Sequence, residues 1–228
     1  MRDGPIGSDH FAVWLDDNAD AATQHLFTYF GGDPGVTYQG RYFESFQQSS
    51  TAGSFTAEDF LAIGALSVTV PAQTAHRMIT DASGAYRQLL SECQHLINNA
   101  PGADLATCPE PWLFDDASPF VKLYHRLRRE SGCGPVVTSK LLAAKYPSLI
   151  PIRDSRVEWL LDLSHRSDWW KPMRELFAAT AATLTRLTGT GSFDHVVALR
   201  RLDVVLWMEA SKRGSADGID SEDDPEGN

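Results

Sequence analysis

Apolar side chains recur every three or four residues along much of this chain, which is the spacing of an amphipathic helix. The pattern is clearest in residues 84–98, 168–188 and 193–212. The segment 57–68 is apolar on nearly every side and predicts a buried central helix. Because alternating patterns are scarce, the sequence predicts an all-α fold of about seven to nine helices.

Two of the predicted helices begin with recognisable signals. Thr56 stands three positions before Asp59 and an apolar run, as in a capping box. Ser118-Pro119 suits an N-cap followed by the first helical residue. The stretch 31–55 is rich in glycine and aromatic residues, which predicts a loop or a short hairpin.

The two ends of the chain carry little that a core could bury. Residues 1–20 have weak periodicity and predict a flexible N-terminus. Residues 213–228 hold one arginine and six acidic residues, which predicts a disordered acidic tail. We therefore expect a single all-α domain over residues 21–212.

Composition narrows the class of protein. The 228 residues are 43% hydrophobic and 22% charged, a profile typical of soluble globular proteins. No apolar run approaches the roughly 20 residues that a membrane helix needs, and the N-terminus lacks a signal-peptide pattern. Cys93, Cys108 and Cys133 are widely spaced, which disfavours disulfides and a metal knuckle. We expect a cytoplasmic protein without membrane association, metal or cofactor.

The charge is unevenly distributed. The formal net charge is −10, which by itself disfavours a nucleic-acid partner. However, residues 121–174 hold eleven basic and five acidic side chains, whereas residues 1–120 hold four arginines and fifteen acidic residues. Such a basic block points to a partner surface. A solvated helix face with no partner remains the alternative.

The basic block contains Gly132-Cys133-Gly134 between two predicted helices, the second of which begins at Pro135. This arrangement exposes backbone N–H groups at a helix N-terminus, where they can bind a phosphate. A plain helical hairpin, in which the glycines only form the turn, remains the alternative. The residues predicted to contact a DNA backbone are Gly132, Gly134, Val136, Arg128, Arg129 and Lys140.

Twenty positions after Gly134, Asp154 ends a proline-flanked apolar run in the segment IPIRDSRVEWLL. Residues 120–163 thereby resemble the helix-hairpin-helix DNA glycosylase superfamily. The resemblance implies a two-lobe helical fold with its hairpin at 120–146, and a catalytic Asp154 between the lobes. FTAEDFLAIGALSV and RRLDVVLWM resemble instead an uncharacterised bacterial family of actinobacterial type.

The resemblance implies hydrolysis of the N-glycosidic bond of a flipped DNA base. A carboxylate such as Asp154 stabilises the developing oxocarbenium charge and orients or deprotonates water. Val136 stands where strand-cleaving relatives carry a lysine, so we expect a monofunctional, water-mediated reaction. Trp169 is a candidate for the base pocket. Asp154 as a simple helix cap remains an alternative, and Trp170, which lies on the apolar stripe of the predicted helix, is expected in the core rather than in a pocket.

Two other functions remain open at this point. One is a non-catalytic helix-hairpin-helix module that binds nucleic acid, and the other is an acidic protein-interaction domain without DNA affinity. Salt-dependent DNA binding would separate the second from the first, and base release would separate both from a glycosylase.

Overall fold

The structure, a computed structural model, describes residues 4–31, 38–164, 168–187, 193 and 195–214. Within these ranges the protein is all-helical, as predicted, and contains no strand. Twelve α-helices and one short 3-10 helix are present there, more than the expected seven to nine. The predicted acidic tail lies outside the described residues from position 215 onward.

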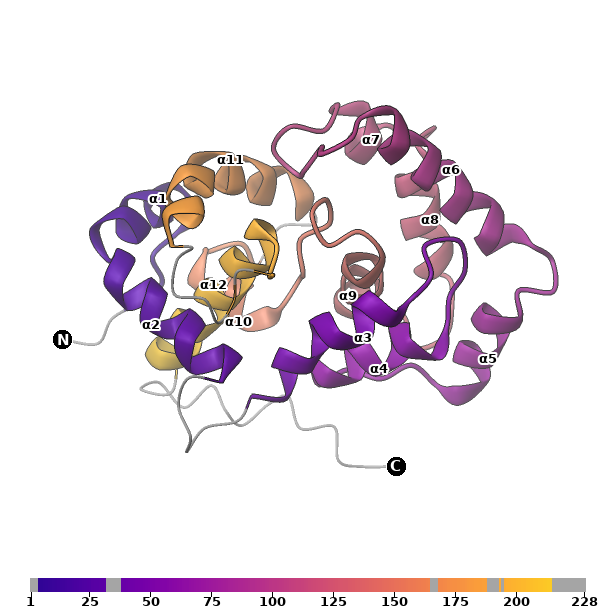
Figure 1. Cartoon of the computed structure of the whole chain (residues 1–228), viewed down its shortest axis with the longest axis horizontal. Helices are drawn as coiled ribbons and strands as arrows, with labels where there is room; N and C mark the ends of the chain where they lie inside the picture. Colours follow the sequence, from indigo (N-terminus) through magenta and orange to yellow (C-terminus); the bar gives the residue numbers. More distant parts are fainter. Residues whose placement is uncertain (1–3, 32–37, 165–167, 188–192, 194, 215–228) are drawn as a thin grey trace.

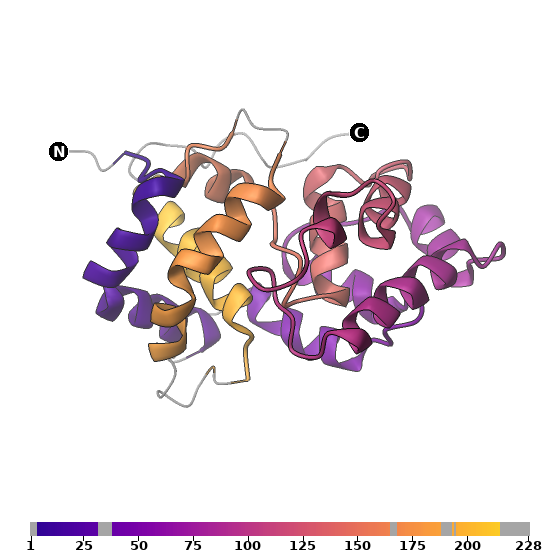
Figure 2. The same cartoon turned by 90° about the horizontal axis from the view of Figure 1, so that it is seen from above.

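One set of helices, which we call the terminal group, comes from the two ends of the chain (Figures 1 and 2). Helix α12 is its centre, because it packs against α2, α10 and α11, while α1 packs on α11. The members are α1 (Ser8–Asp17), α2 (Ala19–Phe30), α10 (Ser155–Leu160), α11 (Trp170–Arg186) and α12 (Ala198–Gly214).

The remaining helices form the central group, which lies beside the terminal group in Figure 2. Its centre is α9, which contacts α3, α4 and α8 and is buried along most of its length. The members are η1 (Gln39–Tyr42), α3 (Phe43–Ser49), α4 (Ala57–Ala65), α5 (Ala72–Thr80), α6 (Ala85–Asn99), α7 (Pro111–Phe114), α8 (Pro119–Leu127) and α9 (Pro135–Lys145).

The three strongest apolar stripes correspond to α6, α11 and α12, which confirms those predictions. Both predicted helix starts are confirmed as well. The backbone N–H of Thr56 donates to Asp59 Oδ2 at 2.7 Å, and Ser118 Oγ accepts from the N–H of Phe120 at 3.2 Å. These signals are local, so tertiary packing does not disturb them.

Three expectations differ from the structure. The stretch 1–20, expected to be flexible, contains α1, because Phe11 and Leu15 find a partner surface on α11. The stretch 31–55, expected to be a loop or hairpin, contains η1 and α3. Helix α4 is not buried all round, since Leu61 is 53% exposed.

The chain passes between the two groups twice, after α2 and again after α9. The return segment, residues 146–154, which we call the arm, carries Pro147 and Pro151; it makes a turn over residues 147–150 and then runs without helix or turn over residues 151–154. The arm is fixed on both sides: the N–H of Arg153 donates to Ser139 Oγ at 2.9 Å, and the indole N–H of Trp169 donates to the Pro151 carbonyl at 3.4 Å. The arm therefore positions Asp154 at the boundary between the two groups of helices.

Candidate functional site

The glycine turn joins α8 to α9 as a tight hairpin. Gly132 has a φ of 78°, a left-handed conformation that glycine adopts without steric cost. Gly134 is the N-cap of α9 and Pro135 is its first residue. The turn is closed by Arg128, whose Nη1 donates to the Cys133 carbonyl at 2.7 Å. The hairpin predicted from the sequence is thus present.

The two glycines have different surroundings. A Cβ on Gly132 would lie 2.3 Å from Pro71 Cδ, so this residue is required by packing against the segment before α5. A Cβ on Gly134 would meet nothing closer than Arg128 Nη1 at 4.0 Å. Gly134 therefore offers open space at the N-terminus of α9, where a ligand could approach.

Several of the predicted phosphate contacts gather at this end of α9. Arg128 and Arg129 are exposed, and Val136 is half-buried in the first helical turn, whose N–H groups have no intrahelical acceptor. Cys133 is buried between the glycines, and burial raises the pKa of its thiol to about 11. Cys133 is therefore a packing residue rather than a nucleophile.

Lys140 does not fit the predicted phosphate contact. Its side chain is 5% exposed and its Nζ donates to the Leu66 carbonyl at 3.0 Å. The reason is that α9 is covered on most sides, so a lysine in its middle points into the protein. There Lys140 Nζ lies 3.4 Å from Asp154 Oδ2.

Asp154 stands at the end of the arm and caps α10. Its Oδ1 accepts from the N–H of Arg156 at 3.2 Å, while Oδ2 faces Lys140. The side chain is 19% exposed, so the carboxylate is held in place and still reached by solvent. Capping and availability for chemistry coexist at this residue.

Trp169 does not fit the predicted base pocket. It is 5% exposed and belongs to the main hydrophobic core, where its ring lies near the guanidinium of Arg153. Trp169 is therefore a packing residue in this structure.

Next to Asp154 the structure contains a charged cluster that the sequence did not indicate. Arg200 of α12 is buried and donates from Nε to Glu44 Oε1 of α3 at 2.8 Å. Its Nη1 pairs with Asp203, and its Nη2 donates to the Tyr29 hydroxyl at 3.0 Å. With the Lys140–Asp154 pair, these side chains form what we call the ionic seam: Glu44, Lys140, Asp154, Arg200 and Asp203.

The ionic seam crosses the boundary between the two groups of helices. Glu44 and Lys140 belong to the central group, while Arg200 and Asp203 belong to the terminal group. No local motif indicates this cluster, because its members come together from α3, α9, the start of α10 and α12. The run Arg200-Arg201-Leu202-Asp203 is a hint, because its charges lie beside the apolar stripe of the predicted helix.

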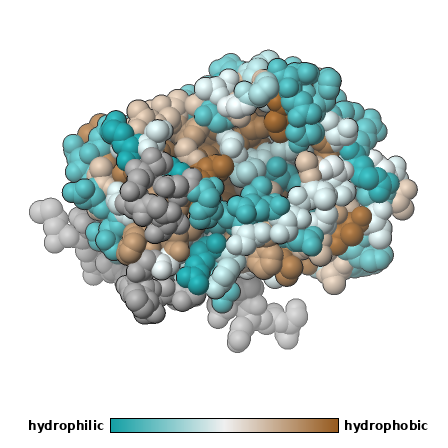
Figure 3. Space-filling view, viewed as in Figure 1, coloured by the Kyte–Doolittle hydropathy of each residue, from teal (hydrophilic) through white to brown (hydrophobic). Residues whose placement is uncertain are grey.

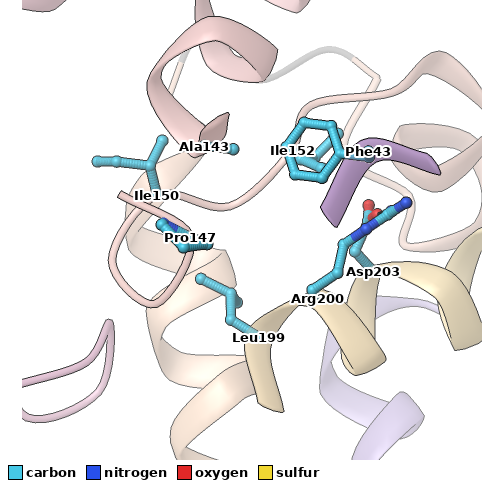
Figure 4. Close-up of a pocket in the computed structure, with 8 residues that line it drawn as sticks. All are labelled: Phe43, Ala143, Pro147, Ile150, Ile152, Leu199, Arg200 and Asp203. Carbon is cyan, nitrogen blue, oxygen red and sulfur yellow. The ribbon is translucent and has the colours of Figure 1, made fainter. Parts of the chain in front are cut away.

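A small cavity adjoins the seam (Figure 4). Arg200 and Asp203 form its polar wall, and the other lining residues are Phe43, Ala143, Pro147, Ile150, Ile152 and Leu199. Its volume of about 10 Å³ is close to the least that holds one water molecule. In the space-filling view, hydrophobic residues are interspersed with hydrophilic ones, and some lie near the middle of the face shown (Figure 3).

Burial and neighbouring charges shift the pKa values in the seam. Burial raises the pKa of Asp203 to about 6, and the charge of Asp154 adds to this rise against the opposing effect of Arg200. Burial lowers the pKa of Arg200, but Tyr29, Glu44 and Asp203 outweigh it and the net shift is upward. Arg200 therefore stays charged, whereas Asp203 changes its charge near pH 6.

A family model described as a family of unknown function, DUF6308, matches residues 22–210. The chain belongs to this family. The DUF6308 match runs from α2 to α12 and includes the hairpin, Asp154 and the whole ionic seam. No curated protein and no solved structure matches the chain.

The helices in the described part of the chain are too short or too polar to cross a membrane. Within the same residues, no cluster of three or more His, Cys, Asp or Glu side chains could hold a metal ion.

Proposed function

We propose that this protein removes a base from DNA by hydrolysing its N-glycosidic bond, with Asp154 as the functional carboxylate. The observation that carries the proposal is the link between the hairpin and Asp154. Helix α9 starts at the glycine turn and bears Lys140, whose ammonium lies 3.4 Å from the Asp154 carboxylate. A DNA backbone on the hairpin would thus lie at a fixed position relative to that carboxylate.

The arrangement of helices supports the finer assignment to a two-lobe fold of helix-hairpin-helix glycosylase type. In this proposal the two lobes are the terminal and central groups, and the site lies between them. The arm from α9 to α10 brings Asp154 to that boundary, as the resemblance implies for the catalytic aspartate.

The chemistry follows from the position of Asp154. Breaking the bond between base and sugar leaves positive charge on the sugar, which a nearby carboxylate stabilises. Asp154 also orients the attacking water and accepts its proton. Lys140 donates to the Leu66 carbonyl and faces the carboxylate, so its role is to hold Asp154 rather than to attack the sugar.

The phosphate contacts come from the N-terminal end of α9. Gly134 and the first-turn amide of Val136 supply neutral donors, and the exposed Arg128 and Arg129 add positive charge. This local basic surface supports DNA binding by a chain whose overall charge is negative.

A non-catalytic nucleic-acid module is the second candidate, and the cavity is the observation that favours it. A space of about 10 Å³ does not hold a base, so base removal requires the two groups of helices to move apart around the seam. If they do not move apart, the hairpin binds DNA and Asp154 acts as a helix cap.

The test is base release from duplex DNA carrying deaminated, oxidised or alkylated bases, measured with an aldehyde-reactive probe for abasic sites. We expect Asp154→Asn to lower release from the preferred DNA roughly 100-fold or more while DNA affinity stays within about threefold. Asp162→Asn is the matched control, because Asp162 is exposed and asparagine tolerates its left-handed φ of 55°. Equal release by wild type and Asp154→Asn would eliminate the mechanism. DNA binding by wild type without release from any substrate would establish the non-catalytic module.

A further inference from the structure

The ionic seam contains more negative than positive side chains. Three carboxylates, those of Glu44, Asp154 and Asp203, face the two cations Lys140 and Arg200. Lys140 forms an ion pair with Asp154, and Arg200 forms ion pairs with both Glu44 and Asp203. With every group ionised, the seam has one negative charge in excess.

This excess negative charge is energetically unfavourable because the side chains that carry it are buried. All five side chains are at least four-fifths buried, and a buried charge without a partner is strongly disfavoured. Within the described residues, Oε2 of Glu44 is buried and accepts no hydrogen bond, which is a further sign that Arg200 does not satisfy both carboxylates. A single proton would balance the charge.

Asp203 is the carboxylate best placed to take that proton. It lines the apolar cavity, whose other walls are mostly aliphatic and aromatic, so little there favours its charged form (Figure 4). Burial and the charge of Asp154 raise its pKa to about 6, against the lowering effects of Arg200 and Lys140. The titratable and charged groups facing Asp203 are Tyr29 of α2, Glu44 of α3, Lys140 of α9, Asp154 at the start of α10 and Arg200 of α12.

We propose that Asp203 is a positioning residue that sets the net charge of the ionic seam. With a proton on Asp203 the seam is neutral, and without it the seam carries one uncompensated negative charge beside Asp154. That extra charge strengthens the attraction of the site for positive charge, such as the charge developing on a sugar. This last step rests on the proposed function, whereas the charge balance itself does not.

The first test is a carboxyl-carbon NMR titration of the intact protein, which needs no substrate. We expect Asp203 to titrate in one step near pH 6 in the wild type. In Asp154→Asn the step moves to lower pH, because a negative neighbour is removed and Lys140 loses its partner. The absence of a step between about pH 4.5 and 8, or an unmoved step in Asp154→Asn, would overturn the inference.

A second measurement is the free energy of unfolding in urea, whose pH dependence reports the protonation of Asp203. The pKa of Asp203 is higher in the folded protein than the roughly 3.9 of an unfolded chain, so the folded state binds more protons between about pH 4 and 6. The wild type therefore loses stability relative to Asp203→Asn as pH rises through this window. Parallel pH curves for the two proteins would contradict the assignment.

The pH dependence of base release separates this inference from the proposed function. The wild-type rate should rise as pH increases through about 6, while Asp203→Asn should stay near the low-pH rate of the wild type. A titrating Asp203 in a protein that releases no base overturns the proposed function and leaves the charge assignment standing. Release with the same pH profile in both proteins overturns the positioning role.

Discussion

Gly132 and Gly134 lie in the same turn but differ in backbone conformation and in their surroundings. Gly132 is left-handed and lies against Pro71, whereas Gly134 has an ordinary φ of −64° and open space around its Cα. The sequence shows the same letter at both positions. Only the surroundings separate a glycine that the fold needs from one that a ligand could use.

We expect Gly132→Ala to lower the free energy of unfolding by at least about 1–2 kcal/mol, because alanine is strained at φ 78° and its Cβ would collide with Pro71. Gly134→Ala should change it by less than about 0.5 kcal/mol, since nothing lies in contact with the new methyl group. Urea denaturation of both variants measures the difference. Equal stabilities would show that the contact between Gly132 and Pro71 does not constrain the turn.

Individual site residues were predictable to different degrees. The helix-capping position of Asp154 follows from local sequence, because the prolines and the following helix are adjacent to it. The burial of Lys140 and Trp169 depends on which helices cover them, so the sequence alone did not indicate it. Glu44, Arg200 and Asp203 could not be found, since their proximity exists only after α3 and α12 come together.

At the scale of elements, apolar periodicity predicted the long helices and missed the short ones. Helices α6, α11 and α12 have 15 to 17 residues, enough for a repeating stripe. Helices α3, α7 and α10 have four to seven residues and complete at most two turns, so they leave no stripe to recognise. These short elements nonetheless carry Glu44 and the cap at Asp154.

Lys145, at the end of α9, ties the loop after α3 to the central group. Its Nζ lies 2.6 Å from Asp59 Oδ2 and donates to the carbonyls of Thr51 and Ser54 at 2.7 and 2.6 Å. Burial lowers the pKa of Lys145, and Asp59 opposes that shift. One buried cation thus fixes both the start of α4 and the loop before it.

We expect Lys145→Met to destabilise the protein by about 3–5 kcal/mol, because it leaves the carboxylate of Asp59 buried without its cation. The double variant Lys145→Met/Asp59→Asn should lose less than the sum of the two single losses. Lys122→Met is the control, since Lys122 is exposed on α8 and should change stability by less than about 0.5 kcal/mol. Chemical denaturation at fixed pH gives all four values. Strict additivity would mean that the pair contributes no coupling.

At the scale of the whole molecule, the boundary between the two groups of helices combines an apolar core with a buried ionic seam. The main hydrophobic cluster includes residues of both groups, so the groups are packed together rather than loosely tethered. Yet both Lys140–Asp154 and Glu44–Arg200 cross the boundary, and buried ion pairs add less stability than apolar contacts of equal size. The boundary is therefore held both by apolar packing and by buried ion pairs that any separation of the groups would have to break.

The structure shows which basic side chains of this acidic chain are buried and which are exposed. The net charge of −10 argues against DNA only if charge is spread evenly. Several basic residues of the block 121–174 are used internally, among them Lys140, Lys145 and Arg174, which donates to the Cys108 carbonyl at 2.8 Å. Other basic residues of the block are exposed, and Arg128 and Arg129 are the exposed ones beside the hairpin.

The measurement that tests the account most directly is fluorescence-anisotropy binding to a duplex containing a stable abasic-site analogue, over a salt series. It requires no knowledge of the target base. The proteins are wild type, Gly134→Glu and the control Gly64→Glu, which places the same side chain in open space on α4. Gly134→Glu fits the structure and sets a negative charge where a phosphate would bind.

The account predicts that wild type and Gly64→Glu bind the analogue more tightly than intact duplex, with an affinity that falls as salt rises. Gly134→Glu should bind at least roughly tenfold more weakly, a loss of about 1.4 kcal/mol. Equal binding of Gly134→Glu and wild type would contradict the role of the hairpin. No binding by wild type near 50 mM salt, where electrostatic attraction is weakly screened, would contradict the assignment to DNA altogether.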